Sequence, residues 1–203
     1  MTRRLVLVSL MVLAFPTWSA SNFVRVPLGH GASIEVPKNW FAISENKRMT
    51  IDAAVEAKGF RLTESTLNFA ANVFDDQGKT MAIVNARFYP ENAGTQEEAK
   101  QFGPREIKTI DADMRGAVDA PLKSMGQHMT RWYGSKMQVI NGLHVYVHEH
   151  QVSRGPGTGL TRIRGMRVWA SPRSFTVTLS YRERDATLLL PIINRMANSI
   201  QLD

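Results

Sequence analysis

Two histidines that could bind a metal lie close together in the second half of the 203-residue chain. His148 and His150 are separated by one residue, so in a β-strand both imidazoles would emerge on the same face. This arrangement can present two nitrogen ligands to zinc or copper. The chain has no cysteine and only 5 histidines, which leaves few further ligands. The two interpretations are a metal site at His148 and His150 or a solvated strand end, and the shortage of ligands favours the second.

An excess of arginine surrounds the same segment. Residues 127–184 contain 9 Lys and Arg but only 2 Asp and Glu, in a chain whose formal net charge is +7. The planar guanidinium suits carboxylates and phosphates better than an ammonium does. The segment therefore predicts an anionic partner, although a set of solvated strand faces would carry the same charges.

The tip of one predicted hairpin combines both kinds of side chain. Its candidate anion-binding or partner-binding residues are Arg154, Arg162, Arg164, His148 and His150. A turn centred at Pro156 would place Arg162 opposite His150 and Arg164 opposite His148, and the charge of such a tip would rise below about pH 6.5. A slip of one residue would separate the two sets, and the sequence leaves this register open. The expected partner is an acidic protein or an anionic envelope surface.

No residue pattern predicts a catalytic site. The chain lacks the G-x-S-x-G and H-E-x-x-H motifs, and the run His148-Glu149-His150 has the wrong spacing for a helical zinc site. Asp111 and Asp113 lie two residues apart in a predicted helix, where their side chains point in different directions. The loop 155–159 is rich in glycine but joins two strands, so it is interpreted as a turn and not as a phosphate site. We expect no catalytic residue and no cofactor.

The first twenty residues have the layout of a secretory signal peptide. Arg3 and Arg4 precede an apolar stretch over residues 5–15, and small residues follow at Ser19 and Ala20. The apolar stretch is shorter than the roughly 20 residues that a transmembrane helix needs. We therefore expect residues 1–20 to be removed, no stable transmembrane anchor to remain, and residues 21–203 to form one periplasmic or secreted domain. Export also argues against a nucleic-acid partner.

Periodicity and turn signals predict the elements that position these residues. A Thr95 to Glu98 capping box and Pro104 each predict the start of a helix, Thr50 is expected to cap a further helix, and Pro121 is expected to kink or end the second one. Strands are expected over residues 22–28, 32–36, 66–73, 80–88, 135–140, 143–152, 160–170 and 175–181. Helices are expected over residues 51–58, from 95, from 104 and from 185 or 187 to 200.

The order of these elements predicts an α+β fold with a largely antiparallel sheet. The strands near residues 143 and 163 carry apolar residues on both faces, and two amphipathic helices are available to pack on them. We therefore expect helices on both faces of the sheet, as in an α-β-α sandwich.

Three short segments resemble the PsbP-like fold family, which is also the fold of the Mog-type Ran-binding factor. They are the strand with Pro and Trp at residues 33–40, the strand with Asn-Gly at 139–145, and the last strand with the closing helix at 175–200. The residues that match in these segments form turns or pack in the core, and they identify no functional residue. The resemblance implies a non-catalytic binding or assembly accessory protein of the cell envelope. The alternatives are a small-ligand or metal-binding periplasmic module, and a hydrolytic enzyme whose site is not visible in the sequence.

Overall fold

The computed structural model describes residues 22–56, 65–89, 94–153, 155, 159–171 and 173–202. The expected signal peptide over residues 1–20 lies outside the described residues, and so does Arg154. Within the described part, no helix is both long and apolar enough to cross a membrane.

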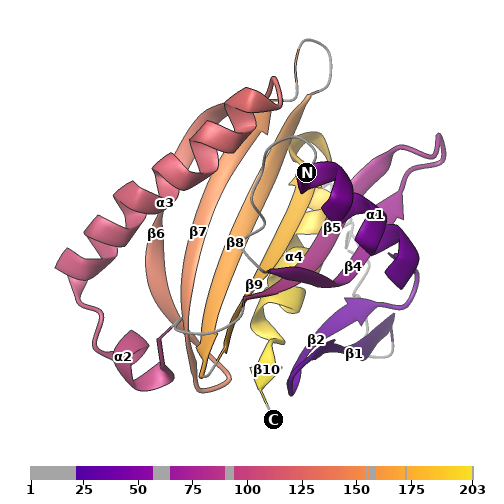
Figure 1. Cartoon of the computed structure of the whole chain (residues 1–203). Coiled ribbons are helices and arrows are strands. Elements are labelled where there is room, and N and C mark those ends of the chain that lie inside the picture. The colour runs from indigo at the N-terminus through magenta and orange to yellow at the C-terminus, as the bar shows by residue number, and fades with distance from the viewer. Residues whose placement is uncertain are drawn as a thin grey trace, which may run out of the picture.

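A seven-stranded sheet forms the centre of the molecule, with the strand order β3-β4-β5-β9-β8-β7-β6 and antiparallel pairing throughout (Figure 1). A second sheet has the order β1-β2-β10. The strands are β1 Phe23–Gly29, β2 Ala32–Pro37, β3 Phe41–Ala42, β4 Thr66–Phe74, β5 Thr80–Tyr89, β6 His128–Ile140, β7 Leu143–Ser153, β8 Leu160–Ala170, β9 Arg173–Arg182 and β10 Gln201–Leu202.

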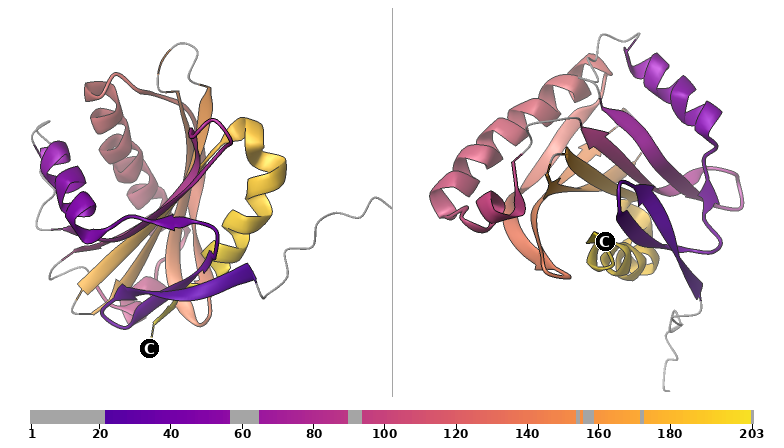
Figure 2. Two further views of the ribbon diagram at one scale, coloured as in Figure 1. Left: turned by 90° about the vertical axis from the view of Figure 1, so that its right-hand side faces the viewer. Right: turned by 60° about the horizontal axis from the view of Figure 1, so that its bottom comes forward.

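Helices lie on both faces of the large sheet, which confirms the predicted α+β fold class. The α-helices are α1 Glu45–Glu56, α2 Gln96–Lys100, α3 Pro104–Ser124 and α4 Ala186–Asn198, and the 3-10 helix η2 spans Glu183–Asp185. Figure 2 shows α4 on the face of the sheet opposite to α1 and α3. We refer to these two faces as the α4 face and the α3 face.

The main apolar core lies between the α4 face of the sheet and α4 itself. Val145, Val168 and Val177 alternate along their strands with residues of the α3 face and are fully buried on the α4 face. Ile193 and Met196 of α4 are also fully buried in this cluster. Burial of each such side chain contributes roughly 1.5–3 kcal/mol, so this face anchors the closing helix.

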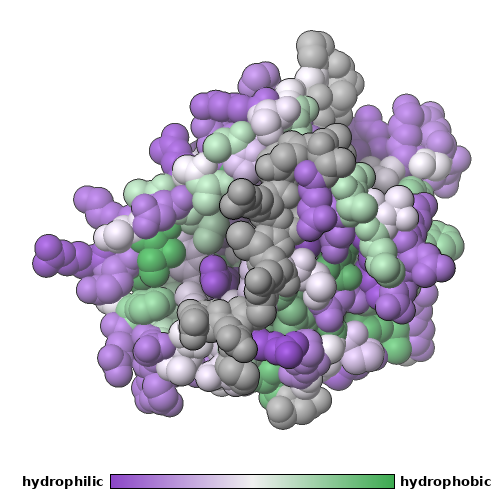
Figure 3. Space-filling view, in the orientation of Figure 1, coloured by the Kyte–Doolittle hydropathy of each residue, from purple (hydrophilic) through white to green (hydrophobic). Residues whose placement is uncertain are grey.

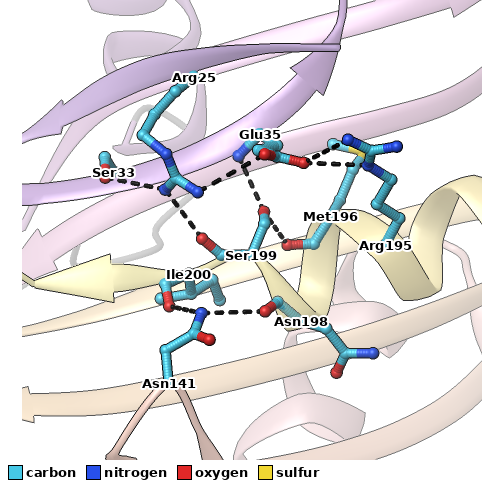
Figure 4. Close-up of polar contacts among 9 residues, drawn as sticks. All are labelled: Arg25, Ser33, Glu35, Asn141, Arg195, Met196, Asn198, Ser199 and Ile200. Atoms are coloured by element: carbon cyan, nitrogen blue, oxygen red, sulfur yellow. Dashed lines mark hydrogen bonds and ion pairs between the residues drawn. The ribbon is translucent and has the colours of Figure 1, made fainter. Parts of the chain in front are cut away.

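The C-terminal end of α4 is held by polar contacts with two hairpins (Figure 4). The side-chain amide of Asn141, in the turn between β6 and β7, donates to the carbonyl oxygens of Asn198 and Ile200 at 3.0 and 2.9 Å. The hydroxyl of Ser199 accepts from the backbone N–H of Glu35 in β2 at 2.8 Å. The Asn-Gly turn, the Ser-Ile helix end and the strand that precedes Pro37 therefore contact one another, although they are far apart in sequence.

Three predicted boundaries differ from the structure. Helix α1 begins at Glu45, so Thr50 is not its cap, and its hydroxyl instead donates to the carbonyl of Asn46 at 3.0 Å. Helix α3 continues past Pro121 to Ser124. The Thr95 to Glu98 capping box, in contrast, is confirmed in α2. Strand β6 begins at His128 instead of Ser135, because two bulges interrupt the alternation that marks a strand in the sequence.

Candidate functional site

The register of the β7–β8 hairpin, which the sequence left open, differs by one residue from that of a turn centred at Pro156. Arg164 pairs with Glu149, and Gly165 pairs with His148. Of the two alternatives, the structure therefore has the one in which Arg162 and Arg164 do not lie opposite the histidines, so the five candidate residues do not form one tip. Because side chains alternate between faces, the register places His148 and His150 on the α3 face and both arginines on the α4 face.

The two histidines are buried between the sheet and α3. His148 and His150 are 8% and 4% exposed, and their nearly parallel rings have centroids 5.6 Å apart. Both rings stack on Trp132 of β6, with centroid distances of 5.4 and 5.7 Å. The His148 ring occupies the space where a side chain at Gly165 would lie. These histidines pack as aromatic side chains and take no part in an exposed hairpin tip.

The histidine pair is electrically neutral at neutral pH. Burial lowers the pKa of His148 to about 4, although the carboxylate of Asp111 opposes this shift, and burial lowers the pKa of His150 to about 4 as well. Asp111 of α3 accepts a hydrogen bond from the Trp132 indole at 3.0 Å. Within the described residues, no three His, Asp or Glu side chains gather in a group that could hold a metal ion.

On the α4 face, Glu149 is enclosed by two arginines. Its carboxylate oxygens accept from the Nε of Arg164 at 2.6 Å and from the Nη2 of Arg162 at 3.1 Å. Burial alone would raise the pKa of Glu149, but the two guanidiniums hold it below its usual value. Arg164 also donates to Asn194 of α4 at 2.9 Å, so this network joins the sheet to the closing helix.

Further cations lie next to this network on the same face. The Arg162 guanidinium lies 3.4 Å from the centroid of the Tyr133 ring, and that of Arg131 lies 4.6 Å from it. Arg131 and Lys136 are both exposed, and neither forms an ion pair within the described residues. Their charges are therefore available to a partner, whereas those of Arg162 and Arg164 are largely neutralised by Glu149.

Two adjoining hollows connect these residues into one groove. Cavities of about 230 and 120 Å³ share Lys136, Val147 and Glu149 in their walls. We call this feature the basic groove and define it, together with Arg131 beside it, by Arg131, Tyr133, Lys136, Gln138, Glu149, Arg164 and Asn194. It is the candidate functional site, because it combines exposed cations with an aromatic ring and carboxamide groups in a concave surface.

Sequence reasoning found only part of this groove. The arginine-rich composition pointed to Arg164, but nothing in the sequence pattern identified Tyr133 or Lys136 as its neighbours. The bulge between Trp132 and Gly134 allows Tyr133 to contact Arg162 on the α4 face. A bulge of this kind leaves no alternation signal, so a sequence pattern assigns neighbouring residues to the wrong faces.

A larger hollow of about 380 Å³ lies at the ends of β5 and β9. Its wall includes Arg182, which pairs with Asp75 at 2.7 Å and with Asp185 at 2.6 Å. These bonds join the β4–β5 turn to the start of α4, so Arg182 stabilises the fold and is not free for a ligand. No nucleophile and base are paired in this wall.

Comparisons with known proteins identify the fold. Neither the protein-family models nor the curated proteins that were searched match the sequence. The solution structure of cyanobacterial PsbP (CyanoP) from Synechocystis sp. PCC 6803 has a TM-score of 0.52 and 12% identity, with 95% of this chain and 99% of that chain covered.

Two crystal structures are less similar. LpqN, involved in cell envelope biogenesis of Mycobacterium tuberculosis, has a TM-score of 0.48 and 11% identity over 93% of this chain and 99% of its own. A Pseudomonas aeruginosa protein of unknown function has a TM-score of 0.44 and 11% identity over 90% and 98%. These two scores support no inference about the present chain. From the similarity to cyanobacterial PsbP, and from its large antiparallel sheet with helices on both faces, the chain has a PsbP-like fold.

Proposed function

We propose that this chain is an exported, non-catalytic binding or assembly accessory protein of the cell envelope, which contacts an acidic protein through the basic groove. The single observation that carries the proposal is the pair of exposed cations without an ion-pair partner in the described chain, Arg131 and Lys136. Lys136 and the Tyr133 ring line the same hollow, and the Arg131 guanidinium lies against that ring. Export is supported by the composition of residues 1–20.

The internal charges of the groove support a protein carboxylate as the ligand. Glu149 holds Arg162 and Arg164 in fixed positions, so the wall of the groove next to Arg131 and Lys136 is preorganised for a partner. The Tyr133 ring holds the guanidinium of Arg162 from another side. Side chains that are already fixed lose little conformational entropy when a partner binds, which favours a specific contact over nonspecific electrostatic attraction.

A membrane surface fits the groove less well than a protein segment does. A bilayer presents a broad, flat array of headgroups, whereas Lys136 lines a hollow whose walls include the carboxylate of Glu149, and Arg131 lies beside that hollow. A narrow acidic segment of a protein can place its carboxylates near Arg131 and Lys136 without approaching Glu149.

The proposal predicts that charge reversal at the two exposed cations weakens binding of an acidic peptide. Fluorescence anisotropy with a labelled glutamate-rich peptide should show that Arg131→Glu/Lys136→Glu weakens affinity by roughly tenfold or more. The matched control is Lys108→Glu/Arg115→Glu, which makes the same change in charge at exposed positions of α3. In Figure 3, hydrophilic side chains project outward on the side of the molecule where Figure 1 places α3.

Two results would contradict the proposal. One is equal loss of affinity in both double variants, because this would mean that only the total charge matters. The other is failure of the peptide to bind while phosphatidylglycerol vesicles retain the protein through Arg131 and Lys136, because the ligand would then be a membrane. Arg162 and Arg164 are less suitable targets, since their reversal would leave the partly buried Glu149 among negative charges.

A further inference from the structure

Strand β6 forms a long free edge of the large sheet, next to the basic groove. It is the last strand in the order of the seven-stranded sheet and contains 13 residues. The opposite edge, β3, has only 2 residues, and the edge strand β1 of the small sheet contains Pro27, which has no N–H. Within the described part of the chain, β6 is therefore the edge best able to pair with another strand.

The turn after β6 shows which of its backbone groups face outward. Asn141 and Gly142 both have positive φ, 49° and 82°, as a two-residue type I′ hairpin turn requires. In such a hairpin the flanking pair, Ile140 and Leu143, exchanges both hydrogen bonds, and the next pair, Val139 and His144, exchanges none. The N–H and C=O groups of Val139 and Met137 therefore point away from β7.

An independent contact supports this assignment. The side chain of Gln96 accepts from the N–H of His144 at 2.7 Å and donates to its carbonyl at 3.2 Å. The main-chain groups of His144 thus point away from β6, which requires those of Val139 to point away from β7. Within the described residues, no hydrogen bond reaches the outward groups of Met137 or Val139.

The side chains along this edge differ between its two faces. Lys136 and Gln138 lie on the α4 face and line the basic groove. Met137 and Val139 lie on the α3 face, where Val139 is 63% exposed. A strand added beside β6 would place alternate side chains next to Lys136 and Gln138, and the others next to Met137 and Val139.

We infer that β6 binds an extended segment of a partner protein by strand addition, and that this segment alternates acidic with apolar residues. The inference rests on the proposed function and specifies the partner that the basic groove would accept. Strand β6 contains Arg131 and Lys136 but no acidic residue, so an acidic strand complements it. A second copy of this chain would bring the same cations together, which disfavours β6 pairing with itself.

The test uses the full chain without residues 1–20 and two labelled peptides of equal composition. In one peptide glutamate and valine alternate, and in the other they form separate blocks. The alternating peptide should bind roughly tenfold more tightly, and Val139→Pro should remove that advantage because proline lacks the outward N–H. Val139→Ala keeps this N–H and should retain most of the affinity.

Backbone hydrogen exchange provides a second measurement that needs no variant. The amides of Met137 and Val139 should exchange rapidly in the free protein and become protected when the alternating peptide is added. Equal affinity for the two peptides, or unchanged exchange at both amides, would overturn strand addition. If binding of a glutamate-rich peptide still depended on Arg131 and Lys136, the proposed function would stand while this inference failed. Self-association through β6 in the absence of peptide would also overturn it.

Discussion

Arginines of one strand can have different roles according to the face on which they lie. Arg164 is held by Glu149 and Asn194, and the role that the structure supports for it is to stabilise the contact between sheet and α4. Arg167 points to the α3 face, where its guanidinium lies near Tyr89 and donates to the hydroxyl of Ser174 at 3.3 Å. Charge alone therefore does not identify a binding residue. The unpaired cations on β6 are better candidates because nothing in the described chain neutralises them.

The buried histidines predict a fall in stability at acidic pH. Their pKa values of about 4 in the folded protein lie below the ordinary histidine value of 6.5, so the unfolded chain binds protons more readily. Their contribution should be complete above pH 6.5, decrease between pH 6.5 and about 4, and stay level below that. Between pH 7 and 4.5 the loss should be about 2–3 kcal/mol for each histidine.

Urea denaturation followed by circular dichroism at several pH values measures this effect. The double variant His148→Leu/His150→Leu is the control, since it lacks both titrating groups but retains apolar side chains beneath α3. The wild type should lose more of its free energy of unfolding than the variant as the pH falls. Parallel pH profiles of the two proteins would show that the histidines do not cause the loss.

At the scale of elements, polar contacts between hairpins and a helix end add to the packing of the core. The β6–β7 turn, the end of α4 and strand β2 meet in the contacts of Figure 4, where Arg195 of α4 also pairs with Glu35 at 2.9 Å. These contacts fix α4 on the sheet, and α4 in turn forms one wall of the basic groove through Asn194. The turn residue Asn141 is thus connected with the geometry of the candidate site.

Asn141 has two structural roles: its side chain bonds to the end of α4, and its backbone adopts the positive φ of the turn. Two substitutions separate these roles. Asn141→Gly keeps the positive φ but removes the bonds to Asn198 and Ile200, and should lower the free energy of unfolding by about 1–2 kcal/mol. Asn141→Ala should cost roughly a further 1 kcal/mol, because alanine is strained at this φ. Thermal and urea unfolding measure both changes. Equal stability of the two variants would show that the backbone conformation contributes nothing.

Much of the element order was predictable from the sequence, because alternation, capping boxes and Asn-Gly turns are local signals. The bulges of β6 and the register of β7 with β8 were not. The β7–β8 turn gives no signal as clear as Asn141-Gly142, and a shift of one residue there moves Arg162 and Arg164 to the other face. The excess of positive charge in this segment was therefore evident from the sequence, but the positions of the residues that line the groove were not. The stacking of His148 and His150 on Trp132, and the bond of Trp132 to Asp111 of α3, also join residues that are distant in sequence.

At the scale of the whole molecule, the two faces of the sheet have different contents. The α3 face holds a neutral, aromatic cluster around Trp132, and the α4 face holds the main core together with the basic groove at its β6 edge. The arginine-rich segment contributes to both faces, so its charge is divided by the fold. What remains exposed near the groove is a short row of cations on β6, and this row is where we expect the molecule to meet an acidic partner.

Zero-length crosslinking can show directly whether an acidic peptide lies against the exposed cations of β6. A carbodiimide joins a peptide carboxylate to a lysine amine, and mass spectrometry then identifies the lysine. With the peptide of alternating glutamate and valine, we expect a crosslink at Lys136 that decreases when Arg131→Glu weakens binding. Crosslinks at Lys108 and Lys123 of α3, with none at Lys136, would show that the acidic peptide does not bind at β6.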